Sequence, residues 1–271
     1  MFQQFNISRS GFGTYQKMMF NITNNIANAN TPGYKQTRVE LCTLFPTVLS
    51  EAQAMQADEE VMNPYARKRR GIELGTGVQI QGMTKDFKAG TLNATERELD
   101  VAIEGGGFLQ LRLEDGRTVY TRAGNLKKDQ YGNLQSQGGH FLEPPIRVPQ
   151  DHIDGTITFS EDGKVYCNVA DDSAVREVGQ ILLSNFPNPD GLKMVGQNNY
   201  EETIESGEAI IDVPGRRGLG KIKGRFTEGS NVDIIRELME MIMVQKGLEL
   251  LGKAMNSGTK MLNAGMGVTD K

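Results

Sequence analysis

Hydrophobic residues recur every three or four positions in one segment at each end of the chain. In the first segment these positions are Phe5, Ser8, Phe12, Tyr15, Met19, Ile22, Ile26 and Ala29, and only Ser8 interrupts the apolar series. In the last segment they are Ile234, Leu238, Met241, Gln245, Leu248, Gly252, Met255, Thr259 and Leu262. This spacing keeps the residues on one helical face. The pattern predicts two helices with narrow apolar seams that pack against other helices.

The boundaries of both predicted helices carry local signals. Pro32 cannot continue a helix and disfavours helical geometry at Thr31, so we expect the first helix to run from about Phe2 to Ala29. Ser230 and Asp233 form a capping-box pattern, which predicts that the second helix starts there. We therefore assign residues 1–40 and 227–271 to one inner helical domain.

The period of the hydrophobic pattern changes to two from Val78 onward. Phe108–Leu113 and Thr118–Arg122 alternate in this way on either side of Glu114–Arg117, which predicts a hairpin. Asp-Gly turns recur later in the same region. Residues 78–226 are therefore predicted to form an antiparallel β-rich outer domain. The fold class is α+β, with the terminal helices pairing as a coiled-coil-like layer.

Residues 41–77 fit neither pattern and are predicted to form an extended arm or linker. Leu44–Met62 has weak helical character, and four consecutive basic residues follow at Arg67–Arg70. A solvated surface loop is the alternative interpretation. A basic run without neighbouring aromatic residues is weak evidence for nucleic-acid binding.

Charge and composition favour a protein partner. The chain has 30 Lys and Arg against 34 Asp and Glu, and the net charge of −4 gives no field that would attract nucleic acid or anionic lipid. Its two cysteines do not form a disulfide framework. The first twenty residues contain no unbroken apolar region, so a cleaved secretory signal is not expected. No apolar run approaches the roughly 18 residues of a membrane span, so we expect a protein that is not membrane-embedded.

The sequence contains no recognisable catalytic, cofactor-binding or metal-binding motif, so we expect neither an enzyme nor a cofactor or metal site. His140 and His152 have no Cys or carboxylate partners at metal-ligand spacing. Glu96, Glu98 and Asp100 could imitate a glycosidase carboxylate pair, but their alternation before an apolar strand is typical of an exposed face.

Glycines within the predicted helices suggest that helix formation depends on assembly. Gly11, Gly13, Gly247, Gly252 and Gly258 each cost about 1 kcal/mol of helix stability relative to Ala. In return, glycine allows another backbone to approach closely. We expect the terminal helices to order chiefly when subunits pack together.

Four sequence blocks resemble the bacterial flagellar axial proteins, the family of rod, hook and hook-associated subunits. The first, which we call the asparagine-rich block, is Asn24–Lys35, with the sequence NNIANANTPGYK. The others are Leu99–Phe108, Tyr120–Asn125 and Glu228–Asp233, in the order that the family shows. Together the blocks span nearly the whole chain.

Within the family, the chain resembles distal rod subunits more than proximal ones, because of its length, its arm and the sequence Leu74–Val78. One departure is Gln245–Glu249, which reads QKGLE where the family usually has QRAYE. Another axial subunit, either proximal rod or hook-like, remains the nearer alternative. A β domain that binds or cleaves peptidoglycan is the more distant one.

The resemblance implies a structural subunit of the basal-body rod, which spans the periplasm. The terminal helices would form an inner tube and the β domain an outer layer. Copies would assemble into a helical, tubular drive shaft that transmits torque from motor to hook. Implied partners are further copies of the chain, other rod proteins, the hook protein, the flagellar export apparatus and the surrounding basal-body rings.

Assembly contacts are expected from the helix seams and from the asparagine-rich block. Asn24, Asn25 and Asn28 are expected to bond backbone or neighbouring subunits, with a capped helix end as the alternative. The expected seam consists of Phe5, Phe12, Tyr15, Met19, Ile22, Ile26, Leu238, Met241, Leu248, Met255 and Leu262.

Overall fold

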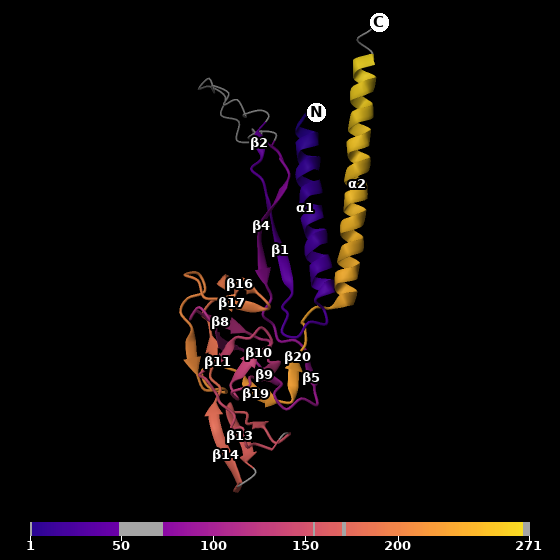
Figure 1. Cartoon of the computed structure of the whole chain (residues 1–271). Helices are drawn as coiled ribbons and strands as arrows, with labels where there is room; N and C mark the ends of the chain where they lie inside the picture. Colours follow the sequence, from indigo (N-terminus) through magenta and orange to yellow (C-terminus); the bar gives the residue numbers. More distant parts are fainter. Residues whose placement is uncertain (1, 49–72, 154, 170–171, 268–271) are drawn as a thin grey trace, which may run out of the picture. The chain divides into compact units, whose positions relative to one another are not determined.

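The computed structural model describes residues 2–48, 73–153, 155–169 and 172–267 (Figure 1). Helix α1 comprises Phe2–Ala27 and helix α2 comprises Ile234–Gly267. The chain between them forms short strands, and the strand pairs with a determined register are antiparallel. These elements confirm the predicted α+β fold class.

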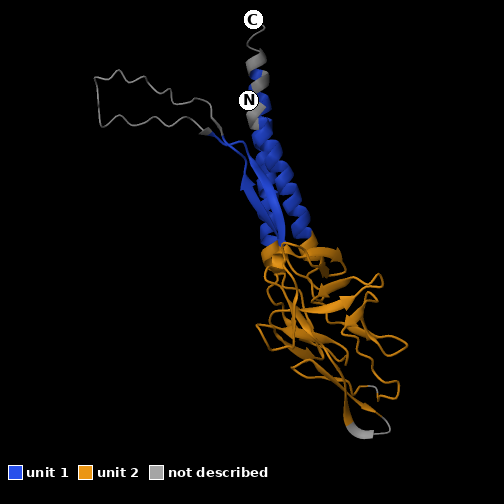
Figure 2. Cartoon of the chain, turned by 90° about the vertical axis from the view of Figure 1, so that its left-hand side faces the viewer, with its two compact units in different colours: residues 1–23, 38–84, 238–271 blue, residues 24–37, 85–237 orange. Residues whose placement is uncertain are grey.

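The chain divides into two compact units (Figure 2). The first, here called the helical unit, contains residues 1–23, 38–84 and 238–271. The second, the β unit, contains residues 24–37 and 85–237. The asparagine-rich block therefore belongs to the β unit, although the sequence pattern assigned it to the helical domain. Conversely, residues 78–84 belong to the helical unit rather than to the β-rich region.

The two helices of the helical unit run antiparallel (Figure 1), and they approach closely at glycines. A Cβ atom built on Gly11 would lie 3.1 Å from Cδ1 of Leu251, and one built on Gly247 would lie 2.8 Å from the ring of Tyr15. Moving four residues forward along α1 thus corresponds to moving four residues back along α2. Glycine permits this approach because it has no side chain.

A β ribbon completes the described part of the helical unit. Strand β1 (Thr37–Thr43) pairs with β4 (Val78–Lys85), and β2 (Thr47–Val48) pairs with β3 (Glu73–Leu74). The hydroxyl of Thr14 on α1 donates to the carbonyl of Val78 at 3.4 Å. Part of the expected arm is therefore ribbon. The basic run Arg67–Arg70 lies outside the described residues.

The largest sheet of the β unit contains the predicted hairpin. Strands β7 (Phe108–Arg112) and β8 (Thr118–Thr121) pair antiparallel, with Leu111 opposite Val119, so that prediction is confirmed. The sheet order is β16 (Lys193–Gly196), β17 (Asn199–Glu201), β8, β7, β11 (Phe141–Glu143), β10 (Leu134–Ser136) and β9 (Leu126–Lys128). Strand β15 (Leu183–Asn185) pairs with β7 and with β18 (Ile210–Asp212).

Smaller antiparallel sheets complete the β unit. They are β6 (Val101–Glu104) with β19 (Lys221–Gly224), β5 (Leu92–Ala94) with β20 (Phe226–Glu228), and β13 (Lys164–Val169) between β12 (Thr158–Phe159) and β14 (Asp172–Gln180). A short 3-10 helix occupies Pro189–Gly191.

Two hydrophobic clusters hold the β unit together. The larger cluster is aliphatic and includes the fully buried Leu109, Leu111 and Leu126. The smaller one is aromatic, and Tyr120 and Phe186 pack edge to face with ring centroids 4.8 Å apart. Adjacent residues of β7 serve both clusters, because successive side chains of a strand point to opposite faces.

The start of α2 differs from the capping-box prediction. The carboxylate of Asp233 accepts hydrogen bonds from the backbone N–H groups of Ile235 at 3.0 Å and Arg236 at 3.3 Å, so Asp233 is the capping residue. The hydroxyl of Ser230 instead accepts from Val232 N at 3.2 Å, too early in the chain to cap the helix. The prediction of Ser230 as the cap was wrong because the helix begins at Ile234.

The aliphatic cluster yields a stability prediction. Leu111→Ala should lower the free energy of unfolding by about 2–5 kcal/mol, because truncation leaves a cavity in a fully buried site. Val175→Ala, on an exposed side chain of β14, should change it by less than about 0.5 kcal/mol. Chemical denaturation monitored by circular dichroism measures both. Equal effects would contradict the assignment of the core.

Candidate assembly surfaces

The asparagine-rich block folds into a buried polar network. The Asn25 side chain is buried, and its oxygen accepts from the Tyr34 hydroxyl and from Thr37 N, both at 3.0 Å. Its amide nitrogen donates to Thr37 O at 3.0 Å and to the Glu237 carboxylate at 3.3 Å. Gln36 also donates to Glu237, at 2.6 Å. The hydrogen-bonding capacity of Asn25 is therefore used within the chain.

Lys35, the last residue of the block, belongs to a buried ion cluster. Lys35 Nζ is 2.7 Å from one carboxylate oxygen of Glu228, and both side chains are fully buried. The Arg122 guanidinium is 3.3 Å from the other oxygen. Gly90 N donates to Glu228 at 2.9 Å, and Lys35 Nζ donates to Lys88 O at 2.6 Å. Burial lowers the pKa of Lys35 and of Arg122, and in each case Glu228 opposes the shift.

Asn24 and Asn28 lie at the end of α1 and bond locally. The amide nitrogen of Asn28 donates to the backbone oxygen of Asn24 at 2.9 Å and to its side-chain oxygen at 3.1 Å. The backbone N–H of Asn28 also donates to the Asn24 carbonyl, at 3.2 Å. The backbone oxygen of Glu228, in another of the recognised blocks, accepts from Gly33 N at 2.8 Å. The blocks thus make specific contacts with one another.

The residues of the expected α1 seam differ in burial within the single chain. Ile22 is buried, whereas Phe5, Tyr15, Met19 and Ile26 are half-buried. Phe12 is 47% exposed, and Phe20, which the seam does not include, is 65% exposed. Small residues fill the buried face instead, at Ser8, Gly11 and Thr14. The buried face is therefore rotated by about one position from the sequence-derived seam.

The expected α2 seam is likewise divided. Met241, Leu248 and Met255 are half-buried, and Leu238 is exposed. Between them, Val244 is buried and Leu251 half-buried. The side chain of Leu262 lies outside the described part.

Sequence reasoning missed an exposed hydrophobic area on α2. We call Leu238, Met239, Ile242 and Met243 the α2 apolar surface, because all four are exposed on a helix whose opposite face is already buried at Val244. A helix that is hydrophobic all round is normally covered. The missed signal was the absence of polar residues at Met239, Ile242 and Met243, between the seam positions.

Among the residues that the structure describes, no cluster of three or more His, Cys, Asp or Glu could hold a metal ion. In the same part of the chain, no helix is both long and apolar enough to cross a bilayer.

The ion cluster yields a prediction about Glu228. Glu228→Gln should lower the free energy of unfolding by about 3–5 kcal/mol, because it leaves the Lys35 cation buried without a counter-charge. Glu161→Gln removes a carboxylate from the exposed pair with Lys221 and should have no measurable effect. Urea denaturation of the two variants and the unsubstituted chain measures the difference. A Glu228→Gln variant as stable as Glu161→Gln would refute the role of the cluster.

Lys85 yields a pH prediction. Burial lowers its pKa from 10.5 to about 8, while its ammonium donates to Lys35 O at 3.0 Å and lies over the Tyr34 ring. Between about pH 8 and 10 the unfolded chain then binds more protons than the folded one, so the free energy of unfolding should rise with pH. Lys85→Met should flatten this rise, whereas Lys88→Met, at an exposed position, should not. Equilibrium unfolding at several pH values measures the slopes, and identical slopes in both variants would contradict the prediction.

Comparison with known proteins matches this architecture within the β unit and in α2. Residues 102–167 match the family model described as the flagellar hook protein FlgE/F/G D1 domain. Residues 223–268 match the model of the flagellar basal body rod FlgEFG protein C-terminal region. The second match covers Glu228 and all of α2.

Similar proteins align over almost the full chain. Flagellar basal-body rod protein FlgG of Caulobacter vibrioides is 34% identical over 97% of both chains. The FlgG protein of Borreliella burgdorferi is 35% identical over 93% of both chains. That of Agrobacterium fabrum is 35% identical over 94% of this chain and 95% of its own. The chain therefore belongs to the FlgE/F/G family of flagellar axial proteins and is similar over nearly its whole length to the basal-body rod protein FlgG.

Proposed function

We propose that this chain is a distal rod subunit whose copies assemble into a helical, tubular shaft that transmits torque to the hook. Its place among structural subunits of the flagellar basal-body rod rests on similarity to FlgG over nearly its full length. The proposed activity is mechanical. The tubular assembly, the transmission of torque and the distal position along the rod go beyond that similarity.

The α2 apolar surface carries the proposal. Leu238, Met239, Ile242 and Met243 are exposed in the single chain, with Ile242 58% exposed and Met243 64% exposed. Complete burial of a fully exposed side chain of this size contributes about 1.5–3 kcal/mol, so covering one that is half exposed contributes roughly half as much. The same helix already packs on α1 through its other face. A neighbouring helix from a second copy is the partner that suits an exposed apolar helix face.

The terminal helices would form the inner layer through both faces. Within one chain, α1 and α2 approach closely at Gly11 and Gly247, which supports the proposed coiled-coil-like pair. Between chains, Phe12 and Phe20 on α1 and the α2 apolar surface would be covered by neighbouring copies. The helical glycines weaken each helix alone, so subunit packing would supply part of the helical order.

Other flagellar axial components are the partners of such a subunit. Contact with the hook protein, the surrounding rings and the export apparatus extends the proposal to particular neighbours. The cited relatives that align over nearly the whole chain are named for the rod, which favours a rod subunit over a hook-like subunit or a peptidoglycan-directed domain.

A charge within the α2 apolar surface should block assembly. Ile242→Asp should reduce incorporation of the chain into basal bodies at least tenfold, because the carboxylate would be desolvated in the helix layer. Asn256→Asp adds the same charge at an exposed polar position of α2 and should assemble normally. Immunogold labelling of isolated basal bodies, with antibody against the β unit, measures incorporation.

The same labelling tests the location. Gold on the rod for the unsubstituted chain supports a rod subunit, and its distance from the hook distinguishes distal from proximal. Label only on the hook would contradict the proposal. Normal incorporation of Ile242→Asp would remove the α2 apolar surface from the assembly interface. Circular dichroism of each purified variant establishes that the β unit is folded.

A further inference from the structure

A tightly bonded turn follows β17 in the β unit. Thr203 and Ser206 bond reciprocally, with Thr203 N donating to Ser206 Oγ at 2.9 Å and Ser206 N donating to Thr203 Oγ1 at 3.2 Å. The Thr203 hydroxyl also donates to Gly191 O at 2.6 Å, and Asn188 donates to Glu205 O at 3.1 Å. Ser206 is fully buried. These bonds fix the turn from both sides.

The fixed turn holds a large apolar side chain in solvent. Ile204 lies between Thr203 and Glu205 and is 102% exposed, more than any other large hydrophobic residue that the structure describes. Folding of the single chain therefore buries none of the Ile204 side chain. A rigid anchor loses little conformational freedom on binding, so such a turn is suited to insertion into a partner.

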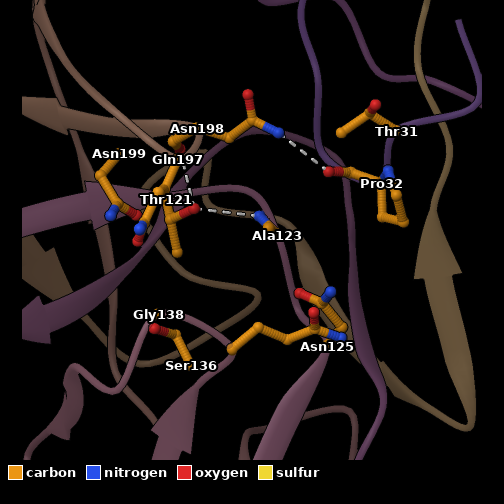
Figure 3. A pocket seen from close by; sticks show the side chains of 11 residues that line it. Thr31, Pro32, Thr121, Ala123, Asn125, Ser136, Gly138, Gln197, Asn198 and Asn199 are labelled. Atoms are coloured by element: carbon orange, nitrogen blue, oxygen red, sulfur yellow. Dashed lines mark hydrogen bonds between the residues drawn. The ribbon is translucent and has the colours of Figure 1, made fainter. Parts of the chain in front are cut away.

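The β unit also contains a hollow of about 390 Å³ (Figure 3). Thr31, Pro32, Thr121 and Ala123 supply aliphatic atoms to its lining. Five lining residues supply amides: Asn125, Gln137, Gln197, Asn198 and Asn199. None of the described residues that line it is charged. The hollow therefore suits an uncharged apolar side chain, with amide groups available for the backbone around it.

The hollow is formed before anything binds. Asn198 donates to the Pro32 carbonyl at 3.2 Å, and the Thr121 hydroxyl donates to Asn198 O at 2.9 Å (Figure 3). Gln197 and Asn198 both have positive φ, as the two central residues of a type I′ hairpin turn require. The asparagine-rich block thus forms one wall and the β16–β17 hairpin another.

Exposed charged residues that adjoin the two features in the sequence are of opposite sign. Glu202 and Glu205 flank Ile204, whereas Lys127 and Lys128 follow Asn125 of the hollow by two and three residues. Complementary charge favours one orientation of docking and suppresses others. A second copy of this chain supplies both halves of the match.

We propose that the Ile204 turn of one copy inserts into this hollow of the next copy in the assembled rod. The inference rests on the proposed function and adds a specific contact of the β unit to it. Because the Ile204 turn and the hollow are different parts of one unit, the contact is heterologous. When the rotation between copies does not close a ring, such a contact repeats along an open helical filament.

Disulfide cross-linking in assembled rods tests the contact. The background is the full chain with Cys42→Ser and Cys167→Ala, which removes both native thiols. Ile204→Cys combined with Gln137→Cys should give a ladder of covalent oligomers on non-reducing gels after mild oxidation of isolated basal bodies. Ile204→Cys combined with Tyr131→Cys, which is exposed and outside the hollow, should give no ladder.

The outcomes separate this contact from the proposed function. Rods that contain the Gln137→Cys variant but give no ladder would overturn the contact and leave the rod subunit in place. Absence of the unsubstituted chain from rods would overturn both.

A substitution pair provides a second readout. Ile204→Asp should reduce incorporation into rods at least tenfold, whereas Ile153→Asp, at another exposed position of the β unit, should not. Equal incorporation of the two variants would overturn the contact.

Discussion

The contact between Lys35 and Glu228 is the constraint on which the β unit depends. It joins residues 193 positions apart and buries both charges completely, so it forms only when the asparagine-rich block and β20 meet correctly. A buried ion pair is weak evidence for stability in itself, but the loss of either partner leaves an uncompensated charge. Here Arg122 and the N–H of Gly90 give the carboxylate further partners. Misplacing any of these segments would strand a charge away from water.

This constraint accounts for the buried residues of the recognised sequence blocks, whereas Thr31, Pro32 and Asn125 of the same blocks line the hollow that we propose as a docking site. Asn25, Tyr34, Lys35 and Glu228 are all buried and bonded within the chain. They fix the internal geometry of the β unit. The features that we propose for assembly are instead exposed apolar positions of the helices, the Ile204 turn and the hollow. Internal polar bonding and external apolar contact are thus divided between different residues.

The helices illustrate the limits of seam prediction. The spacing of Phe5, Phe12 and Met19 indicates a helical face, but α1 buries Ser8, Gly11 and Thr14 more completely. Small residues permit the close approach of α2 and the β1–β4 ribbon, which hydrophobic periodicity cannot reveal. In the same way, Ser230 and Asp233 are equally good caps in the sequence. Only the position at which helical geometry begins selects Asp233.

The sequence by itself determined the α+β class, the β7–β8 hairpin and the family, because periodicity, turn residues and ordered motifs are local properties. Tertiary structure decided that the asparagine-rich block belongs to the β unit, that Glu228 neutralises Lys35, and that Ile204 stands uncovered on a fixed turn. Each of these depends on which distant segments meet. A residue's burial and partners are set by that meeting, and spacing along the chain carries no record of it.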